Sequence, residues 1–159
     1  MNITVLKNGS LQVDNAKIIF RNFRGEASQF NRDGDRNFAL LIPDQETAER
    51  LMNDGWNVKI KPAREDGENP FVYMPIKVKF NARGPRIYLV TGESHNLIEK
   101  DMVDMLDEID IMYVNMDIRP YHWDVRGATG VSAYLSAMEV YQNIDRFAAR
   151  YAEEESPEE

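Results

Sequence analysis

Lysine, arginine and aromatic residues alternate with apolar residues along several short segments of this chain. When residues 71–80 (FVYMPIKVKF) are read as a strand, Tyr73, Lys77 and Lys79 fall on one face and Met74 falls on the other. Cations bind phosphates and aromatic rings stack on bases, so such a surface suits single-stranded nucleic acid. Lysine on an exposed strand face more often serves solubility and edge protection, and only the recurrence of the pattern favours binding.

Similar interleaving occurs in residues 20–36, 56–61, 86–90 and 118–126. The candidate nucleic-acid-binding residues across all these segments are Arg21, Phe23, Arg24, Arg32, Arg36, Lys59, Lys61, Tyr73, Lys77, Lys79, Arg86, Tyr88, Arg119, Tyr121 and Trp123. Other apolar residues of the same segments are expected in the core, among them Phe20, Phe38, Trp56, Val58, Ile60 and Phe80.

The residues that could carry catalysis are few. The chain has no glycine-rich phosphate loop and no common hydrolase or zinc-protease motif, and its two histidines, His95 and His122, are far apart. The Asp33-Gly34-Asp35 segment misses the calcium-loop spacing and is interpreted as a tight turn. We therefore expect a protein that is not an enzyme and holds no metal or cofactor. A metal-dependent nuclease that uses Asp33 or Asp35 is the weaker alternative.

The elements that must position the candidate residues are mostly short strands. Asn8-Gly9 predicts a hairpin turn, Asp44 and Gly55 bracket a helix, and Asn96 with Glu99 forms a capping-box pattern for a second helix. Strands are expected at residues 16–25, 37–42, 56–61, 71–80, 86–90, 110–124 and 130–141, with a turn at Gly127 and Gly130 between the last two and a short helical piece around residues 144–151.

About seven or eight strands with two helices, in no regular β-α-β order, predict a mostly β fold. The best match is an antiparallel barrel of the oligonucleotide-binding type, with the two helices in its connections. One domain is expected over residues 1–151, followed by a disordered acidic tail over residues 152–159.

The net charge of −8 is unevenly distributed along the chain. Residues 57–92 carry a net +4, residues 93–110 carry −6, and residues 153–159 hold five acids and no base. The acidic face of residues 99–108 is expected to be solvated, or to be the working surface if the chain is a protein-interaction module. The chain has no cysteine, no long apolar run and no signal-peptide pattern, so the expected compartment is the cytoplasm, without membrane association.

The pattern as a whole resembles the small single-stranded-DNA-binding proteins of tailed bacteriophages. The likeness rests on the strand-loop-strand of residues 20–42, on IRPYHW and GVSAYLSAMEV at residues 118–123 and 130–140, and on the acidic terminus after Tyr151. It implies an oligonucleotide-binding barrel that coats single strands during phage replication and recombination, in the cytoplasm of the host cell. The alternative is a phage module that acts on a host or replication protein.

The same resemblance implies a role for the acidic tail, whose charged residues are Glu153, Glu154, Glu155, Glu158 and Glu159. In that family the tail competes with DNA for the basic groove and recruits replication or recombination proteins. This chain ends without the aromatic or apolar residue on which such recruitment often depends. Competition needs only charge, and an exposed edge strand would allow a homodimer.

Overall fold

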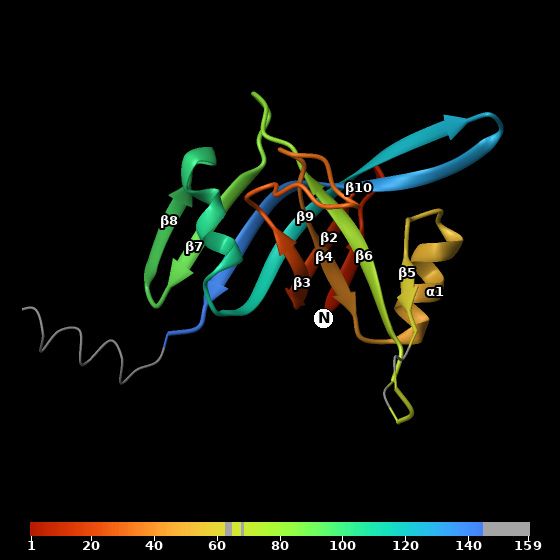
Figure 1. Cartoon of the computed structure of the whole chain (residues 1–159), viewed down its shortest axis with the longest axis horizontal. Helices are drawn as coiled ribbons and strands as arrows, with labels where there is room; N and C mark the ends of the chain where they lie inside the picture. Colours follow the sequence, from red (N-terminus) through yellow and green to blue (C-terminus); the bar gives the residue numbers. More distant parts are fainter. Residues whose placement is uncertain (63–64, 68, 145–159) are drawn as a thin grey trace, which may run out of the picture.

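Ten strands and two helical elements form the described part of the chain, residues 1–62, 65–67 and 69–144 of the computed structural model (Figure 1). The strands are β1 (Asn2–Val5), β2 (Leu11–Ala16), β3 (Ile18–Asn22), β4 (Arg36–Ile42), β5 (Lys59–Lys61), β6 (Phe71–Val78), β7 (Arg86–Thr91), β8 (Ser94–Ile98), β9 (Ile111–Val125) and β10 (Ala128–Gln142). The helical elements are α1 (Gln45–Asn53) and the 3₁₀ helix η1 (Lys100–Asp107). The mostly β prediction is confirmed.

The strands pair in an order that returns to its starting point. Pairing runs from β2 through β9, β10, β6 and β4 to β3, and β3 follows β2 after the single residue Lys17. The chain bends at Asn15, whose φ of 55° is in the left-handed region that asparagine tolerates. Because β2 and β3 act as one bent strand, the sheet curls into a five-stranded barrel of the predicted type.

The sheet is mixed, and not antiparallel throughout as predicted, because β10 runs antiparallel to β9 but parallel to both β6 and β7. Its contact with β6 covers only Ala133↔Ile76 and Tyr134↔Lys77, and its contact with β7 covers residues 137–141. The same edge of β10 therefore pairs first with β6 and then, further along the strand, with β7.

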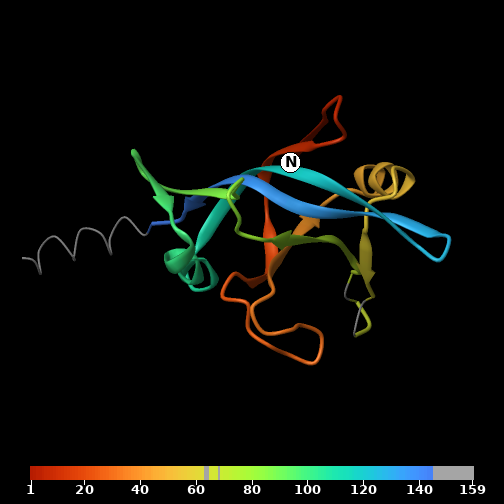
Figure 2. The same ribbon diagram turned by 90° about the horizontal axis from the view of Figure 1, so that it is seen from above.

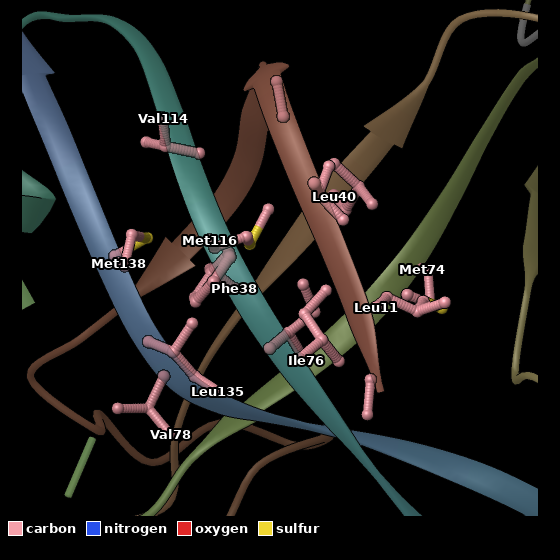
Figure 3. Packing of buried hydrophobic residues seen from close by; sticks show 14 of the residues in the cluster. Leu11, Phe38, Leu40, Met74, Ile76, Val78, Val114, Met116, Leu135 and Met138 are labelled. Atoms are coloured by element: carbon pink, nitrogen blue, oxygen red, sulfur yellow. The ribbon is translucent and has the colours of Figure 1, made fainter. Parts of the chain in front are cut away.

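Buried side chains from β2, β4, β6, β9 and β10 fill the barrel interior (Figure 3). They include Leu11 of β2, Leu40 of β4, Ile76 of β6, Ile118 of β9 and Leu135 of β10, none of them more than 2 % exposed. The predicted alternation in β6 is confirmed, since Met74, Ile76 and Val78 are buried and their neighbours are not. Strand β6 therefore has one apolar face in the core and one face turned away from it.

The β9–β10 hairpin is the longest element and projects beyond the barrel past α1 (Figures 1 and 2). Its turn is Arg126-Gly127, with φ values of 52° and 85°, the double positive φ that suits the twist of a two-residue hairpin turn. Gly130, expected in this turn, lies instead within β10 opposite Trp123.

The alternation predicted for β3 is wrong because the strand contains a bulge. The register moves from Ile19↔Ala39 to Asn22↔Asn37, so β3 advances one residue more than β4, and Phe20 has a φ of 52°. As a result Phe20, expected in the core, is 50 % exposed. Phe23, expected on the binding face, is fully buried and stacks on Phe38 at 5.1 Å between ring centroids.

Helix α1 begins and ends where predicted. Asp44 accepts hydrogen bonds from the Thr47 hydroxyl at 2.6 Å and from the Thr47 backbone N–H at 2.9 Å, and these bonds hold the Asp44 pKa below its ordinary value. Gly55 follows the helix with a φ of 91°. The next residues pair with β10 through Val131, and Trp56 is buried as expected. Ile60 is 60 % exposed, contrary to expectation, because β5 is a three-residue strand that pairs only with β6.

The second helix begins later than predicted, at Lys100 and not at Asn96, and it is the 3₁₀ helix η1. Residues 94–98 are strand β8, which pairs with β7 through a two-residue turn at Gly92-Glu93, and η1 begins only at Lys100. Strand pairing with β7 outweighs the local capping pattern, and Glu99, the residue that caps η1, makes no side-chain capping bond. Residues 145–151 of the expected terminal helical piece lie outside the described residues.

Candidate nucleic-acid interface

The outward face of β6 is a row of aromatic and cationic side chains. Phe71, Tyr73, Pro75 and Lys77 alternate with the buried residues of the strand and span roughly 20 Å, at about 3.3 Å per residue. Pro75 lies where the edge of β6 changes partner from β5 to β10. Because proline has no N–H to donate, it is tolerated at such a break in the ladder.

The first half of this row is extended by side chains from β3 and β5 into a group that we call the β3–β6 cluster, made of Phe20, Lys61, Phe71 and Tyr73. The Phe20 ring meets Tyr73 edge-on at 5.2 Å between centroids. The Lys61 ammonium lies 5.2 Å from the Phe20 centroid and 5.7 Å from that of Phe71. The bulge in β3 is what turns Phe20 outward to this surface.

At the other end of the row, Lys77, Arg119, Tyr121 and Tyr134 form a second group, the β6–β10 cluster. The cross-strand register places Lys77 and Arg119 on either side of Tyr134. Their charged groups lie 5.6 and 4.7 Å from the Tyr134 ring centroid, and Tyr121 meets that ring edge-on at 5.9 Å. The ion pairs formed among the described residues include neither of these two cations nor Lys61.

Trp123 extends the aromatic surface along the β9–β10 hairpin. Its ring lies directly against Gly130, where a Cβ atom would come within 2.4 Å of Trp123 Cζ2. Only glycine, which has no Cβ, leaves room for the ring at this position, which explains why Gly130 lies inside a strand.

Four of the candidate residues are committed to holding η1 and the core. Phe23 is buried. Arg21 Nη1 donates to the carbonyl oxygens of Leu106 and Ile109, both at 2.7 Å. Arg24 pairs with Glu26, Asp107 and Glu108, and its hydrogen bond to Glu108 raises the Arg24 pKa. Arg36 lies over the Phe80 ring at 5.8 Å and 3.9 Å from Asp104.

The acidic face of η1 is therefore only partly solvated. Asp107 accepts hydrogen bonds from the backbone N–H groups of Phe23 and Arg24, at 2.7 and 3.1 Å, and its side chain is 11 % exposed. An acid expected to face water instead joins η1 to the end of β3.

The remaining candidates lie outside both clusters. Lys59 of β5 lies opposite Tyr73 in the strand register, and Lys79 follows the end of β6. Arg32 is exposed in the β3–β4 loop, where it forms an ion pair with Asp35 at 3.3 Å. Arg86 and Tyr88 lie apart on β7 and belong to neither cluster.

The outer face of β9–β10 becomes acidic beyond Arg119. Asp117, Asp14 and Glu139 line a shallow hollow together with Tyr88. Partial burial, and then the nearby Asp14 charge, raise the Asp117 pKa. Further along, burial raises the pKa of Tyr141, which stacks on Tyr113 at 4.4 Å. An anion that lay along the two clusters would be repelled by the carboxylates of this acidic hollow.

Three cluster members were absent from the candidates, namely Phe20, Phe71 and Tyr134. Alternation places Phe71 and Tyr134 on the outward faces of their strands, since each lies two residues from another outward side chain. Phe20 could not, because the bulge that exposes it has no glycine or proline to mark it in the sequence.

No group of three or more potential metal ligands occurs among the residues that the structure places, and no helix there is long and apolar enough to cross a membrane. The five tail glutamates, Glu153 to Glu155 with Glu158 and Glu159, lie outside the described residues.

Comparisons with known proteins also indicate single-stranded DNA binding. A family model described as "Putative phage ssDNA-binding domain" matches residues 2–159. The structure is similar to the single-stranded DNA-binding protein from bacteriophage Enc34 in complex with ssDNA, with a TM-score of 0.60 and 13 % identity over 92 % of this chain and 93 % of that chain. A C-terminal truncation of the Enc34 protein gives a TM-score of 0.59 and 12 % identity over 91 % of each chain.

At these identities the likeness to the Enc34 structures shows a shared fold. A search of curated proteins gave no match.

Proposed function

The chain belongs to the phage ssDNA-binding domain family, and we propose on that premise that it binds single-stranded DNA along the outer face of β6. In this proposal it coats single strands during phage DNA replication or recombination and catalyses no reaction. The observation that carries the proposal is the continuous row from the β3–β6 cluster to the β6–β10 cluster, with cations held beside aromatic rings and not in ion pairs among the described residues.

The chemistry of this row suits single strands better than duplexes. Exposed rings can stack only on bases that are not already stacked, and each such contact is worth about 1–3 kcal/mol. Every base has a π face, while Lys and Arg contact phosphates that carry no sequence information. Binding is therefore expected to tolerate any base sequence. The corresponding sheet face of oligonucleotide-binding barrels is where their ligands bind.

The acidic tail is assigned a competing role on the basis of its sequence and family. Five glutamates in residues 153–159 offer the basic row an intramolecular anion. Removing them is expected to strengthen DNA binding, most clearly at low salt, where charge interactions are least screened. We rank the other candidate function, capture of a partner protein by the acidic face of η1, second, because Asp107 and Glu108 of that face form ion pairs with Arg24.

Fluorescence anisotropy of a labelled oligothymidylate and of a matched duplex tests the proposal. Both are titrated with the full chain and with a chain ending at Ala152, at low and moderate salt. The expected result is single-strand binding that weakens with salt and strengthens on truncation. Absence of single-strand binding by either form at low salt would overturn the proposed function, and equal affinity of the two forms would overturn the role of the tail alone.

A matched pair of double variants locates the binding surface. Lys61→Ala with Lys77→Ala removes one cation from each cluster, and Lys7→Ala with Lys100→Ala removes the same charge at exposed sites outside both clusters. The first pair is expected to reduce the log–log salt slope by about 1.4, or about 0.7 per lost phosphate contact. The second pair is expected to leave the slope unchanged; equal slopes for the two pairs would move the binding surface elsewhere.

A further inference from the structure

Phe30, in the loop between β3 and β4, is 89 % exposed, the highest value among the large apolar side chains of the described chain. Single exposed apolar residues are common on protein surfaces, so exposure alone assigns no role. What distinguishes Phe30 is the structure of the loop that holds it.

The loop is held in one conformation by a hydrogen-bond network centred on Asn31. Asn31 Nδ2 donates to the carbonyl oxygens of Glu26, Arg32 and Asp35 at 2.8, 3.1 and 3.0 Å. Ser28 and Asn31 exchange backbone hydrogen bonds, and the Phe30 N–H donates to Ser28 Oγ at 3.1 Å. The aromatic ring is therefore presented to solvent by backbone that is fixed on both of its sides.

The same network places the loop beside the β6–β10 cluster. Asn37 Nδ2 donates to Asn31 Oδ1 at 2.9 Å, and Asn37 is the cross-strand partner of Lys77. A row of outward residues thus runs from Arg119 through Tyr134, Lys77 and Asn37 to Asn31, the neighbour of Phe30. In Figure 2 the loop (orange) extends away from the barrel, on the side opposite the β1–β2 turn.

We propose that Phe30 is a base-stacking residue, presented by a preformed loop to a nucleobase of the strand bound at the β6–β10 cluster. The inference deepens the proposed function and rests on it. A phenyl ring loses little conformational freedom on binding, and a loop already in its bound shape avoids the cost of ordering.

Substitutions at Phe30 separate stacking from simple apolar contact. Phe30→Ala and Phe30→Leu both remove the ring, whereas Phe30→Tyr keeps it, and Gln29→Ala alters an adjacent exposed side chain of the same loop. Anisotropy with a labelled oligothymidylate is expected to show binding weakened about 5- to 150-fold for Ala and for Leu. Phe30→Tyr and Gln29→Ala are expected to stay within about two-fold of the original chain.

A second reporter follows the ring itself. Phe30→Trp introduces an exposed indole, and its emission, after subtraction of the signal from Trp56 and Trp123 in the original chain, is expected to be quenched by unlabelled oligothymidylate and protected from acrylamide. Duplex at the same concentration is expected to leave it unchanged.

The role of the network is tested by Asn31→Ala, which removes the three donor contacts of Asn31 and the acceptor of Asn37 Nδ2, and leaves Phe30 in place. Weaker DNA binding with little change in the thermal midpoint of unfolding is the expected result, because a mobile loop must be ordered on binding.

The outcomes distinguish this inference from the proposed function. If the original chain binds the oligothymidylate and Phe30→Ala binds equally well, the stacking role is overturned while the proposed function stands. If Phe30→Ala instead lowers the sedimentation coefficient of the free protein and leaves DNA affinity unchanged, Phe30 is a contact between copies of the chain and the inference is wrong. Failure of the original chain to bind would overturn both.

Discussion

Two regions of this protein carry similar side chains and use them differently. The end of β3 has Arg21, Phe23 and Arg24, and the centre of the β6–β10 cluster has Lys77, Arg119 and Tyr134. At β3 the guanidinium groups bond to the carbonyls and carboxylates of η1 and the ring is buried. In the β6–β10 cluster the cations lie beside an aromatic ring and belong to no ion pair among the described residues.

The difference arises from the neighbouring element and not from residue type. The end of η1 lies next to β3 and brings the carbonyl groups of Leu106 and Ile109 to Arg21, and Asp107 and Glu108 to Arg24. Tyr134 is instead flanked by strands whose outward residues are Lys77 and Arg119. A cation without an ion-pair partner still attracts an external anion, whereas the charge of a paired cation is already neutralised by its partner within the fold.

The largest expected effect tests the structural side of this comparison. Asp107→Ala leaves the backbone N–H groups of Phe23 and Arg24 without their acceptor in a partly buried place. We expect the free energy of unfolding to fall by about 3 kcal/mol, since two donors and one cation lose their partner. The thermal midpoint, measured by circular dichroism, should fall by roughly 6–12 °C.

Asp101→Ala is the matched control, because Asp101 is an exposed acid on the same helix. Its midpoint should change little, and equal effects of the two variants would contradict the structural role of Asp107.

Next in size is the contrast between two tyrosines. Tyr134→Ala removes the ring between Lys77 and Arg119, and DNA affinity is expected to fall by about 1–3 kcal/mol in anisotropy titrations. Tyr88→Ala removes a ring beside the acidic hollow, where an anion is repelled, and affinity should stay near that of the original chain. If Tyr88 proved the more sensitive position, the DNA path would have to cross β7.

A smaller effect compares the two arginine environments directly. Arg119→Gln is expected to reduce the log–log salt slope of DNA binding by about 0.7, the loss of one phosphate contact. Arg24→Gln should leave the slope unchanged and lower the thermal midpoint instead, because Arg24 holds Asp107 and Glu108. A reduced slope for Arg24→Gln would mean that its ion pairs open when DNA binds.

The smallest expected effect concerns the acidic limit of the surface. Since the Asp117 pKa is raised, the folded protein binds this proton more tightly than the unfolded chain, and stability falls as the pH rises through the ordinary carboxyl pKa toward the raised value. Asp117→Asn should therefore raise the thermal midpoint at pH 7, by about 2 °C at most for so exposed a group. The gain should shrink as the pH is lowered toward about 4, where the carboxyl is increasingly protonated; a gain independent of pH would rule out charge as its cause.

The sequence was sufficient to predict much of the fold and the central part of the candidate site. Alternation in residues 71–78 correctly separated Met74 and Ile76 from Tyr73 and Lys77, because a strand with one buried face must change face at each residue. The caps of α1 were equally readable, since Asp44 and Gly55 satisfy local backbone requirements.

Prediction failed where contacts distant in sequence decided the outcome. Asn96 and Glu99 have a helix-start pattern, but pairing with β7 makes residues 94–98 a strand. The β3 bulge reverses the positions of Phe20 and Phe23, and no residue near it marks the extra step. Such features depend on partner strands whose register is set by the whole barrel.

By itself, then, the sequence determined which segments have one apolar face and which side chains could bind a polyanion. These properties follow from local periodicity and from residue chemistry. The tertiary structure alone decided that Arg21 and Arg24 face the carbonyls and acids of η1, while Lys77 and Arg119 face Tyr134. The physical reason is that a charge binds an external ligand only if the fold brings no opposite charge or acceptor to it first.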